Sequence, residues 1–269
     1  MRTCNSNAQL QAALKRFRSE GQSIVFVPTM GNLHEGHLDL VRKARTLCDI
    51  VVVSIFVNPL QFGAGEDLDG YPRTMAADKE KLFAEGVQLL YAPGVEDIYP
   101  DGMSRQTIVS VPELGDTLCG SSRPGHFDGV TTVVSKLFNI VQPDVSVFGE
   151  KDFQQLQLIK TIAGNIEIVT APTIRENDGL AMSSRNVRLT PEDRTAAQVI
   201  YRALSESTSE AQLRAILASE PALTVDYADF IDEKTFAHAQ SDTQDMRAIV
   251  AGWINGVRLI DNMSMGNRA

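Results

Sequence analysis

The sequence predicts an α/β fold: a Rossmann-like, doubly wound parallel sheet followed by a smaller C-terminal α+β domain. From residue 8 to 172, short apolar runs alternate with amphipathic stretches, as in sheets whose parallel strands are joined by helices. After about residue 175 this alternation ends, and helical patterns are followed by strand-like runs. We therefore expect one domain over residues 1–175 and a second over residues 176–269.

The first domain begins with an amphipathic helix over 8–20, which ends at Gly21, and a buried strand over 24–29. A second helix follows Gly36, and the run 50–58 is almost wholly apolar, which is typical of a strand covered on both faces. Strand, helix and strand in this order form a right-handed parallel unit. The same alternation predicts the remaining elements: helices over 74–86, 130–142 and 153–163, and strands over 87–93, 144–149 and 166–172.

The second domain opens with a helix-start signal, in which Thr190 is the expected N-cap and Pro191 occupies the first turn. Its predicted elements are helices over 191–206 and 209–219, and strands over 224–232, 247–254 and 257–262.

Composition and charge limit the function classes. The 269 residues are 43% hydrophobic and 22% charged, which is ordinary for a globular protein, and no apolar run approaches the ~20 residues that span a bilayer. The net charge of −9 argues against DNA or RNA as the main partner, because phosphate backbones are bound by basic surfaces. The polar N-terminus lacks a signal core, and three widely spaced cysteines indicate neither disulfides nor a cysteine zinc site. We expect a cytoplasmic protein that binds neither nucleic acid nor a membrane.

The segment 28-PTMGNLHEGHLDLV-41 carries the strongest functional signal. It lies where a strand gives way to a helix, and the free N–H groups and positive dipole of a helix start suit a phosphate. Gly31 and Gly36 let the backbone approach a ligand closely. His34 and His37 can then donate hydrogen bonds to phosphate oxygens and stabilise the charge of a five-coordinate α-phosphate. Two alternatives stay open: a turn with a capping histidine, and a metal pair that lacks a third ligand nearby in sequence.

Two further segments lie at predicted strand ends or after them. In 149-GEKDFQQL-156, Lys151 can neutralise phosphate, Asp152 can accept from ribose hydroxyls or cap the helix, and Gln155 offers a donor and an acceptor to a polar substrate. In 182-MSSRN-186, two hydroxyls beside an arginine suit a phosphate. A solvated helix start and an ordinary surface loop are the respective alternatives.

Amide side chains follow the apolar strand in 58-NPLQFG-63. Asn58 and Gln61 suit recognition of a small hydroxy acid, and Asn-Pro turn chemistry is the alternative. The segment 121-SSRPGHFDGV-130 is polar and contains glycine, so we expect a mobile lid whose arginine and histidine reach an anion, or else a plain surface loop.

A histidine-bearing turn near the first strand and a Ser-Ser-Arg loop after the last strand resemble the layout of adenylate-forming nucleotidyltransferases and class I tRNA synthetases. H-E-G-H resembles their HIGH signature, and M-S-S-R resembles KMSKS with Arg185 where a lysine is usual. More specifically, six segments in this order resemble the pantoate–β-alanine ligase family over about residues 24–190, and 257-VRLIDN-262 also fits. These segments are PTMGNLHEGH, SIFVNPLQF, YPRT, RPGHFDGV, FGEKDFQQ and DGLAMSSRN.

The resemblance implies ATP-dependent condensation of pantoate with β-alanine through a pantoyl-adenylate, with release of pyrophosphate and AMP, in pantothenate and coenzyme A biosynthesis. It implies ATP as co-substrate, Mg²⁺ beside it, and a homodimer. It also implies that residues 1–175 bind nucleotide and pantoate, and that residues 176–269 act as a hinge or lid.

The resemblance assigns site residues as well. The catalytic set is His34, His37, Lys151, Ser183, Ser184 and Arg185. The ATP-binding set is Met30, Gly31, Asn32, Leu33, His34, Glu35, Gly36, His37, Gly149, Glu150, Lys151, Asp152, Ile174, Met182, Ser183, Ser184 and Arg185. The pantoate and β-alanine set is Gln61 and Gln155, with Asn58 and Arg123 as second-tier candidates. No metal ligand is certain, and Asp78 is the candidate, through a water molecule.

Two other functions stay open at this point. A cytidylyl- or adenylyltransferase would keep the nucleotide on its product, whereas the two glutamines and the RPGHF segment favour the ligase. A nucleotide-binding regulatory module without catalysis would need neither both histidines nor Lys151.

Overall fold

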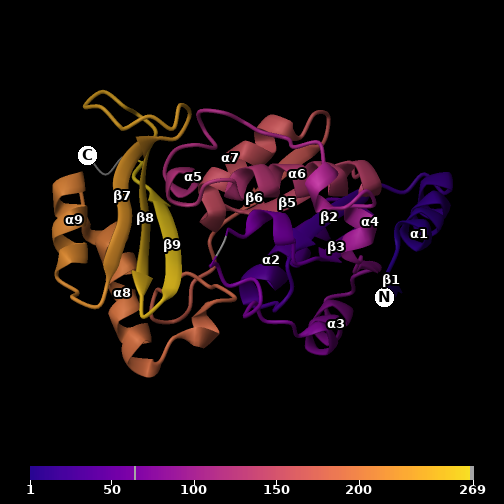
Figure 1. Cartoon of the computed structure of the whole chain (residues 1–269), viewed down its shortest axis with the longest axis horizontal. Helices are drawn as coiled ribbons and strands as arrows, with labels where there is room; N and C mark the ends of the chain where they lie inside the picture. Colours follow the sequence, from indigo (N-terminus) through magenta and orange to yellow (C-terminus); the bar gives the residue numbers. More distant parts are fainter. Residues whose placement is uncertain (64, 267–269) are drawn as a thin grey trace. The chain divides into compact units, whose positions relative to one another are not determined.

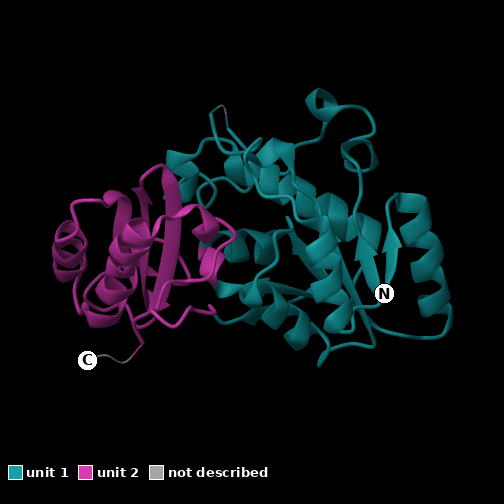
Figure 2. Ribbon diagram, turned by 90° about the horizontal axis from the view of Figure 1, so that it is seen from below, with its two compact units in different colours: residues 1–150, 154–172 teal, residues 151–153, 173–269 magenta. Residues whose placement is uncertain are grey.

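The computed structural model describes residues 1–63 and 65–266, which form two compact units (Figure 2). The first unit comprises Met1–Glu150 and Gln154–Pro172, and the second comprises Lys151–Phe153 and Thr173–Ala269. The second unit thus takes three residues from the end of the sheet region.

The first unit is built on a six-stranded sheet in which every neighbouring pair is parallel (Figure 1). The strand order is β1-β4-β3-β2-β5-β6. The chain runs from the central β2 outward through β3 to β4, then returns to β5 on the other side of β2. This reversal is the switch point of a doubly wound sheet, where ligands bind beyond the carboxyl ends of the strands. The strands are β1 Arg2–Cys4, β2 Ile24–Thr29, β3 Ile50–Ile55, β4 Leu89–Tyr91, β5 Val145–Gly149 and β6 Glu167–Ala171.

Helices cover both faces of this sheet. Alternate β2 residues point to opposite faces: Val25 and Val27 pack in one buried cluster with Val41 of α2, whereas the Phe26 ring lies 6.4 Å from that of Phe138 on α6. The fold predicted from the sequence is therefore confirmed. The helical elements between residues 1 and 172 are α1 Asn7–Ser19, α2 Glu35–Ala44, α3 Met75–Ala84, α4 Val95–Ile98, α5 Cys119–Ser122, α6 His126–Val141 and α7 Phe153–Ile162, with 3₁₀ turns η1 Pro59–Gln61, η2 Met103–Arg105 and η3 Glu150–Asp152.

Two local predictions differ from the structure. The apolar run after Ile50 was expected to be a strand to residue 58, but β3 ends at Ile55 because Asn58 and Pro59 start the η1 turn. The segment 121–130 was expected to be a mobile lid or a plain surface loop, but it contains the end of α5 and the first turns of α6. Gly125, with φ +78°, supplies the left-handed residue that separates these two helices.

The second unit is an antiparallel sheet in the order β7-β8-β9, packed against two helices (Figure 1). Its helix start is as predicted: the Asp193 N–H donates to the Thr190 hydroxyl at 3.1 Å, and Pro191 occupies the first turn. Its elements are η4 Asn186–Arg188, α8 Pro191–Glu206, α9 Glu210–Ala218, β7 Thr224–Asp232, β8 Met246–Ile254 and β9 Val257–Ser264.

Among residues 1–63 and 65–266, no helix combines the length and the apolar character needed to cross a membrane.

Candidate active site

The histidine-bearing turn follows β2 at the switch point of the sheet. Gly31 and Asn32 both have left-handed backbones, with φ +82° and +48°. A Cβ on Gly31 would lie 3.0 Å from Ile55 Cγ2 and 3.2 Å from Asp78 Oδ2. The turn therefore requires glycine at this position for both its backbone angle and the space around it.

Helix α3 holds this turn in place through Asp78, whose side chain is 1% exposed. Asp78 Oδ2 accepts from the Asn32 N–H at 3.0 Å and from the Thr74 hydroxyl at 3.1 Å, and Oδ1 accepts from the Leu33 N–H at 2.8 Å. A charged carboxylate makes these bonds stronger than neutral ones. The carboxylate thus fixes two consecutive main-chain N–H groups of the turn.

The two histidines occupy the start of α2. His34 is the N-cap, and its carbonyl accepts from the His37 N–H at 2.9 Å. In return the His34 N–H donates to His37 Nδ1 at 3.3 Å, and the two ring centroids lie 4.0 Å apart. Because a main-chain N–H is only a donor, Nδ1 must accept, and the ring proton of His37 then resides on Nε2. The capping geometry thus places an N–H donor on the other side of this ring.

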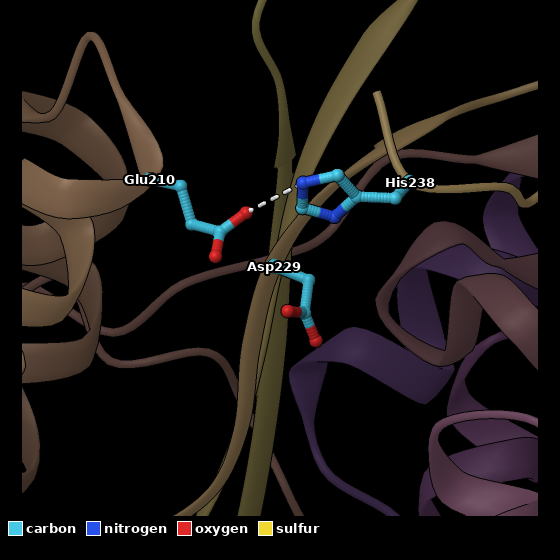
Figure 3. A group of neighbouring side chains, drawn as sticks. All are labelled: Glu210, Asp229 and His238. Atoms are coloured by element: carbon cyan, nitrogen blue, oxygen red, sulfur yellow. Dashed lines mark ion pairs between the residues drawn. The ribbon is translucent and has the colours of Figure 1, made fainter. Parts of the chain in front are cut away.

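The alternative of a metal pair at the two histidines finds no third ligand among the described residues. In the part of the chain that the structure describes, one group of three side chains is close enough to share a metal, and it lies in the second unit: Glu210, Asp229 and His238 (Figure 3).

That group is better explained as an ion-pair network. His238 Nε2 lies 3.3 Å from Glu210 Oε2, while Arg214 contacts Glu210 at 2.9 Å and Asp229 at 2.7 Å. Burial raises the pKa of the Asp229 carboxyl, and the Arg214 guanidinium opposes that shift. The Arg214 guanidinium thus already pairs with both carboxylates, and the network joins α9 to β7.

Gln61 ends the η1 turn and is 8% exposed. Asn58, 1% exposed, donates from Nδ2 to Gln61 Oε1 and to the Gly129 carbonyl, both at 3.1 Å. A Cβ on Gly129 would lie 2.6 Å from Gln61 Cα, so α6 and η1 are in direct backbone contact. Asn58, predicted as a second-tier substrate ligand, has its amide engaged inside the protein.

The arginine and histidine of the predicted lid are also engaged within the first unit. Arg123 makes a bidentate ion pair with Glu66, at 2.7 and 2.6 Å, and this guanidinium lowers the pKa of the Glu66 carboxyl. Arg123 Nη1 lies 2.9 Å from His126 Nε2, and His126 Nδ1 lies 2.8 Å from the Gln61 carbonyl oxygen. The segment is therefore tied to the backbone of a predicted substrate ligand.

Two consecutive glutamines near the start of α7 differ in burial. Gln154 is 7% exposed, donates to the carbonyls of Leu114 and Thr117, both at 2.8 Å, and accepts from the Cys119 N–H at 3.2 Å. Gln155, the predicted pantoate ligand, is half-buried. Gln154 thus anchors the 114–119 segment.

Lys151 belongs to the second unit, where Asn262 Nδ2 of β9 donates to its carbonyl at 2.8 Å. Two residues along, Phe153 stacks on Phe236 with centroids 5.5 Å apart, and the Arg247 guanidinium lies 4.0 Å from the Phe153 centroid. These contacts fix the backbone that carries Lys151.

A short hairpin precedes the Ser-Ser-Arg loop. The Met182 N–H donates to the Ile174 carbonyl at 3.0 Å, and Arg175 and Ala181 form an antiparallel bridge. At its tip Gly179 has φ +87°, and a Cβ there would overlap the neighbouring tyrosine ring of α8. The hairpin therefore places Ile174 and Met182, two predicted ATP-binding residues, opposite each other.

The loop itself is fixed by a buried amide. Asn186, 8% exposed, donates to the Ala181 carbonyl at 3.1 Å and to Glu176 Oε1 at 3.0 Å. Glu176 also binds Arg194 at 2.6 Å, and that hydrogen bond lowers the pKa of its carboxyl. Within the loop, the Arg185 N–H donates to the Ser183 hydroxyl at 3.2 Å.

Comparison with known proteins identifies the family. The family model described as pantoate-beta-alanine ligase matches residues 2–264. The chain belongs to the pantoate–β-alanine ligase family. The match includes residues 205–245, for which the short motifs give little support.

Individual relatives agree over nearly their whole length. Pantothenate synthetase of Pseudomonas entomophila is 53% identical over 98% of this chain and 97% of its own, and that of Marinobacter nauticus is 50% identical over 98% and 99%. The crystal structure of pantothenate synthetase from Thermus thermophilus has a TM-score of 0.91 and 44% identity, covering 99% of this chain and 100% of that one. The Francisella tularensis ligase, solved with beta-gamma ATP and beta-alanine, has a TM-score of 0.86 and 37% identity, covering 98% and 97%.

The reaction of this family is the ATP-dependent condensation of pantoate with β-alanine to pantothenate, through pantoyl-adenylate and with release of AMP and pyrophosphate. The chain is a pantoate–β-alanine ligase of this kind. A cytidylyltransferase and a binding module without catalysis are thereby set aside.

Sequence reasoning missed the residues that hold the site in place. The sequence predicts Asp78 only as a metal candidate, and it predicts no role for Glu66, for Gln154 or for Tyr99, whose hydroxyl donates to Asn58 Oδ1. Because each acts on a segment distant in sequence, no local motif marks it.

Proposed function

We propose that the turn at residues 28–37 binds the phosphates of ATP, and that His37 acts at the α-phosphate. The observation that carries this proposal is the start of α2 at the carboxyl end of β2, where the His34 N–H holds His37 Nδ1. That contact places the ring proton on Nε2, which can donate to a ligand. The helix start adds N–H groups and a positive dipole end for the phosphates.

The same proposal assigns nucleotide contacts to the second unit. Lys151 and Arg185 neutralise phosphate charge, and Ser183 and Ser184 donate from their hydroxyls. Asp152 accepts from the ribose. The remaining proposed ATP contacts are Met30, Gly31, Asn32, Leu33, Glu35, Gly36, Gly149, Glu150, Ile174 and Met182.

Pantoate and β-alanine are proposed to bind at Gln61 and Gln155, whose amides offer both donors and acceptors to hydroxyls and a carboxylate. Arg123 is a candidate for an anion, but it must share its guanidinium with Glu66. Asn58 we reassign from a substrate contact to support of Gln61, because its side chain is 1% exposed.

Mg²⁺ is proposed to accompany ATP, and it supplies positive charge to the phosphates when bound. Asp78 does not fit as its ligand, because it is 1% exposed and both of its oxygens accept hydrogen bonds from the protein. Mg²⁺ commonly keeps several waters and phosphate oxygens as ligands, so its binding requires no dedicated carboxylate cage. A homodimer and a cytoplasmic location stay predictions from the sequence.

The residues then divide the chemistry as follows. A pantoate carboxylate oxygen attacks the α-phosphorus, and the bond to the pyrophosphate oxygen breaks with its electron pair. His37 donates from Nε2 to an α-phosphate oxygen as its charge grows, and Lys151 stabilises the departing pyrophosphate. The β-alanine amine next attacks the acyl carbon, AMP leaves with the C–O electron pair, and the proton that the amine loses passes to water.

Pantoate-dependent exchange of labelled pyrophosphate into ATP, without β-alanine, tests this proposal. We expect exchange in the native protein and a drop of about 100-fold or more in His37→Ala, comparable to the loss of one oxyanion donor. His238→Ala is the matched control, because this exposed histidine lies in the second-unit ion-pair network. Absence of pantoate-dependent exchange in the native protein would remove the proposed site, and normal exchange in His37→Ala would remove the role of His37.

A further inference from the structure

Behind Gln61 lies a buried chain of side-chain hydrogen bonds that no sequence motif marks. The Tyr99 hydroxyl donates to Asn58 Oδ1 at 2.7 Å, and Asn58 Nδ2 donates to Gln61 Oε1 at 3.1 Å. Tyr99 and Asn58 are 2% and 1% exposed. All three residues belong to the first unit, at the carboxyl end of β3 and just after α4.

The orientation of the Asn58 amide is forced by its main-chain partners. Its Oδ1 faces the Leu60 N–H, at 3.3 Å, which is only a donor. Its Nδ2 faces the Gly129 carbonyl, at 3.1 Å, which is only an acceptor. An inverted amide would therefore oppose two like groups at once.

Asn58 in turn fixes the Gln61 amide. Because Nδ2 is a donor, Gln61 must present Oε1 to it, so Nε2 points the other way. There Nε2 donates one of its two hydrogens to Met30 Sδ, at 3.3 Å, in the histidine-bearing turn. Gln61 therefore presents its NH₂ group, and not its carbonyl oxygen, beside the histidine-bearing turn.

The Tyr99 side chain is packed inside the first unit. Its ring lies 6.4 Å from that of Phe56, and the Lys136 ammonium lies 5.4 Å from its centroid. Burial raises the pKa of Tyr99, so its hydroxyl stays protonated and remains a donor at ordinary pH.

We propose that Tyr99 and Asn58 are positioning residues that orient the Gln61 carboxamide, so that its Nε2–H donates to an oxygen of pantoate. This inference rests on the proposed binding of pantoate at Gln61. A pantoate carboxylate can only accept, so an inverted glutamine would oppose it with an oxygen.

The test measures pantoate-dependent pyrophosphate exchange over a full range of pantoate concentrations, and again of ATP concentrations, so that kcat, KM and kcat/KM are obtained for each. Tyr99→Phe removes one hydroxyl, and we expect about a five-fold fall in kcat/KM for pantoate through a higher KM, with the KM for ATP unchanged. Asn58→Asp removes the donor and inverts Gln61, and we expect a fall of more than about thirty-fold. Tyr91→Phe is the matched control, because Tyr91 is also buried and donates to Asn7 away from these residues.

A double-mutant cycle separates positioning from a general loss of stability. If Tyr99 acts through Gln61, Tyr99→Phe should have no further effect on pantoate in a Gln61→Ala background. An equal effect in both backgrounds, an unchanged pantoate KM in Tyr99→Phe, or an equal shift in the KM for ATP would each overturn the inference. Failure of the native protein to exchange would instead overturn the proposed site itself.

Discussion

Asp78→Asn should strongly lower kcat/KM for ATP, although asparagine has nearly the same size and shape as aspartate. The native carboxylate accepts from the N–H groups of Asn32 and Leu33 and from the Thr74 hydroxyl. Hydrogen bonds to a charged group contribute roughly 1.5–3 kcal/mol each. Asparagine can keep its oxygen toward Asn32 and Thr74, but it loses the negative charge and its NH₂ group then opposes the Leu33 N–H, so the net loss is about 2–4 kcal/mol.

This loss of hydrogen-bond free energy should act at Asn32, whose backbone is left-handed with φ +48°. A non-glycine residue in this region costs on the order of 1–2 kcal/mol, and Asp78 supplies the bonds that hold it there. Once the turn relaxes, its N–H groups no longer converge on a phosphate. If all of the loss reaches ATP binding, kcat/KM for ATP falls about 30- to 1000-fold.

The assay is pyrophosphate exchange with ATP varied at saturating pantoate, together with the thermal unfolding midpoint. Asp97→Asn is the matched control, because Asp97 accepts from the N–H groups of Asn7 at 3.2 Å and Gly94 at 3.1 Å, away from the turn. The reasoning is refuted if Asp78→Asn keeps its kcat/KM for ATP, or if both variants lose it in proportion to their loss of Tm.

Three further predictions concern the framework. Gly129→Ala would place a Cβ 2.6 Å from Gln61 Cα, so Tm should fall by several degrees and the pantoate KM should rise. Arg123 lowers the pKa of the Glu66 carboxyl below its ordinary value of 4.5. Their ion pair therefore stabilises the fold fully above pH 4.5, and this contribution is lost as the pH falls through the lowered pKa. Glu66→Gln removes the titrating group, so Tm should depend less on pH on the acid side of a Tm-against-pH profile. Thr190→Ala removes the N-cap of α8 and should cost about 1 kcal/mol in urea unfolding with exchange unchanged.

The strands could be predicted because buried parallel strands are apolar on both faces, so 24–29, 50–55 and 145–149 stand out in the sequence. The edge strand β1 could not, because Arg2–Cys4 is short and polar, and only its pairing with β4 makes it a strand. The end of β3 was overestimated because the apolar pattern continues past Ile55.

The candidate site also contains residues that could be predicted from the sequence and residues that could not. The residues proposed to contact a phosphate or a hydroxy acid lie in sequence motifs, so His37, Lys151 and Gln61 could be named from the sequence. Residues that hold them do not, because Asp78 lies 46 residues from Asn32, and Tyr99 lies 41 from Asn58. Those pairs meet only through the order of strands in the sheet.

The interpretation of His34 and His37 as a capping turn and their interpretation as ATP ligands are compatible, because the two uses take different ring nitrogens. The His34 N–H occupies His37 Nδ1, so an imidazolium would have to give up this bond. We therefore expect His37 to act through a neutral Nε2–H, with positive charge supplied by the helix start and by Lys151.

Glutamine places an amide N–H near the position of Nε2 but cannot carry a proton. His37→Gln should then retain at least about ten-fold more pantoate-dependent exchange than His37→Ala. The reason is that a hydrogen bond alone supplies this part of the effect of an oxyanion donor. Equal loss in both variants would instead favour an imidazolium or a proton transfer at His37.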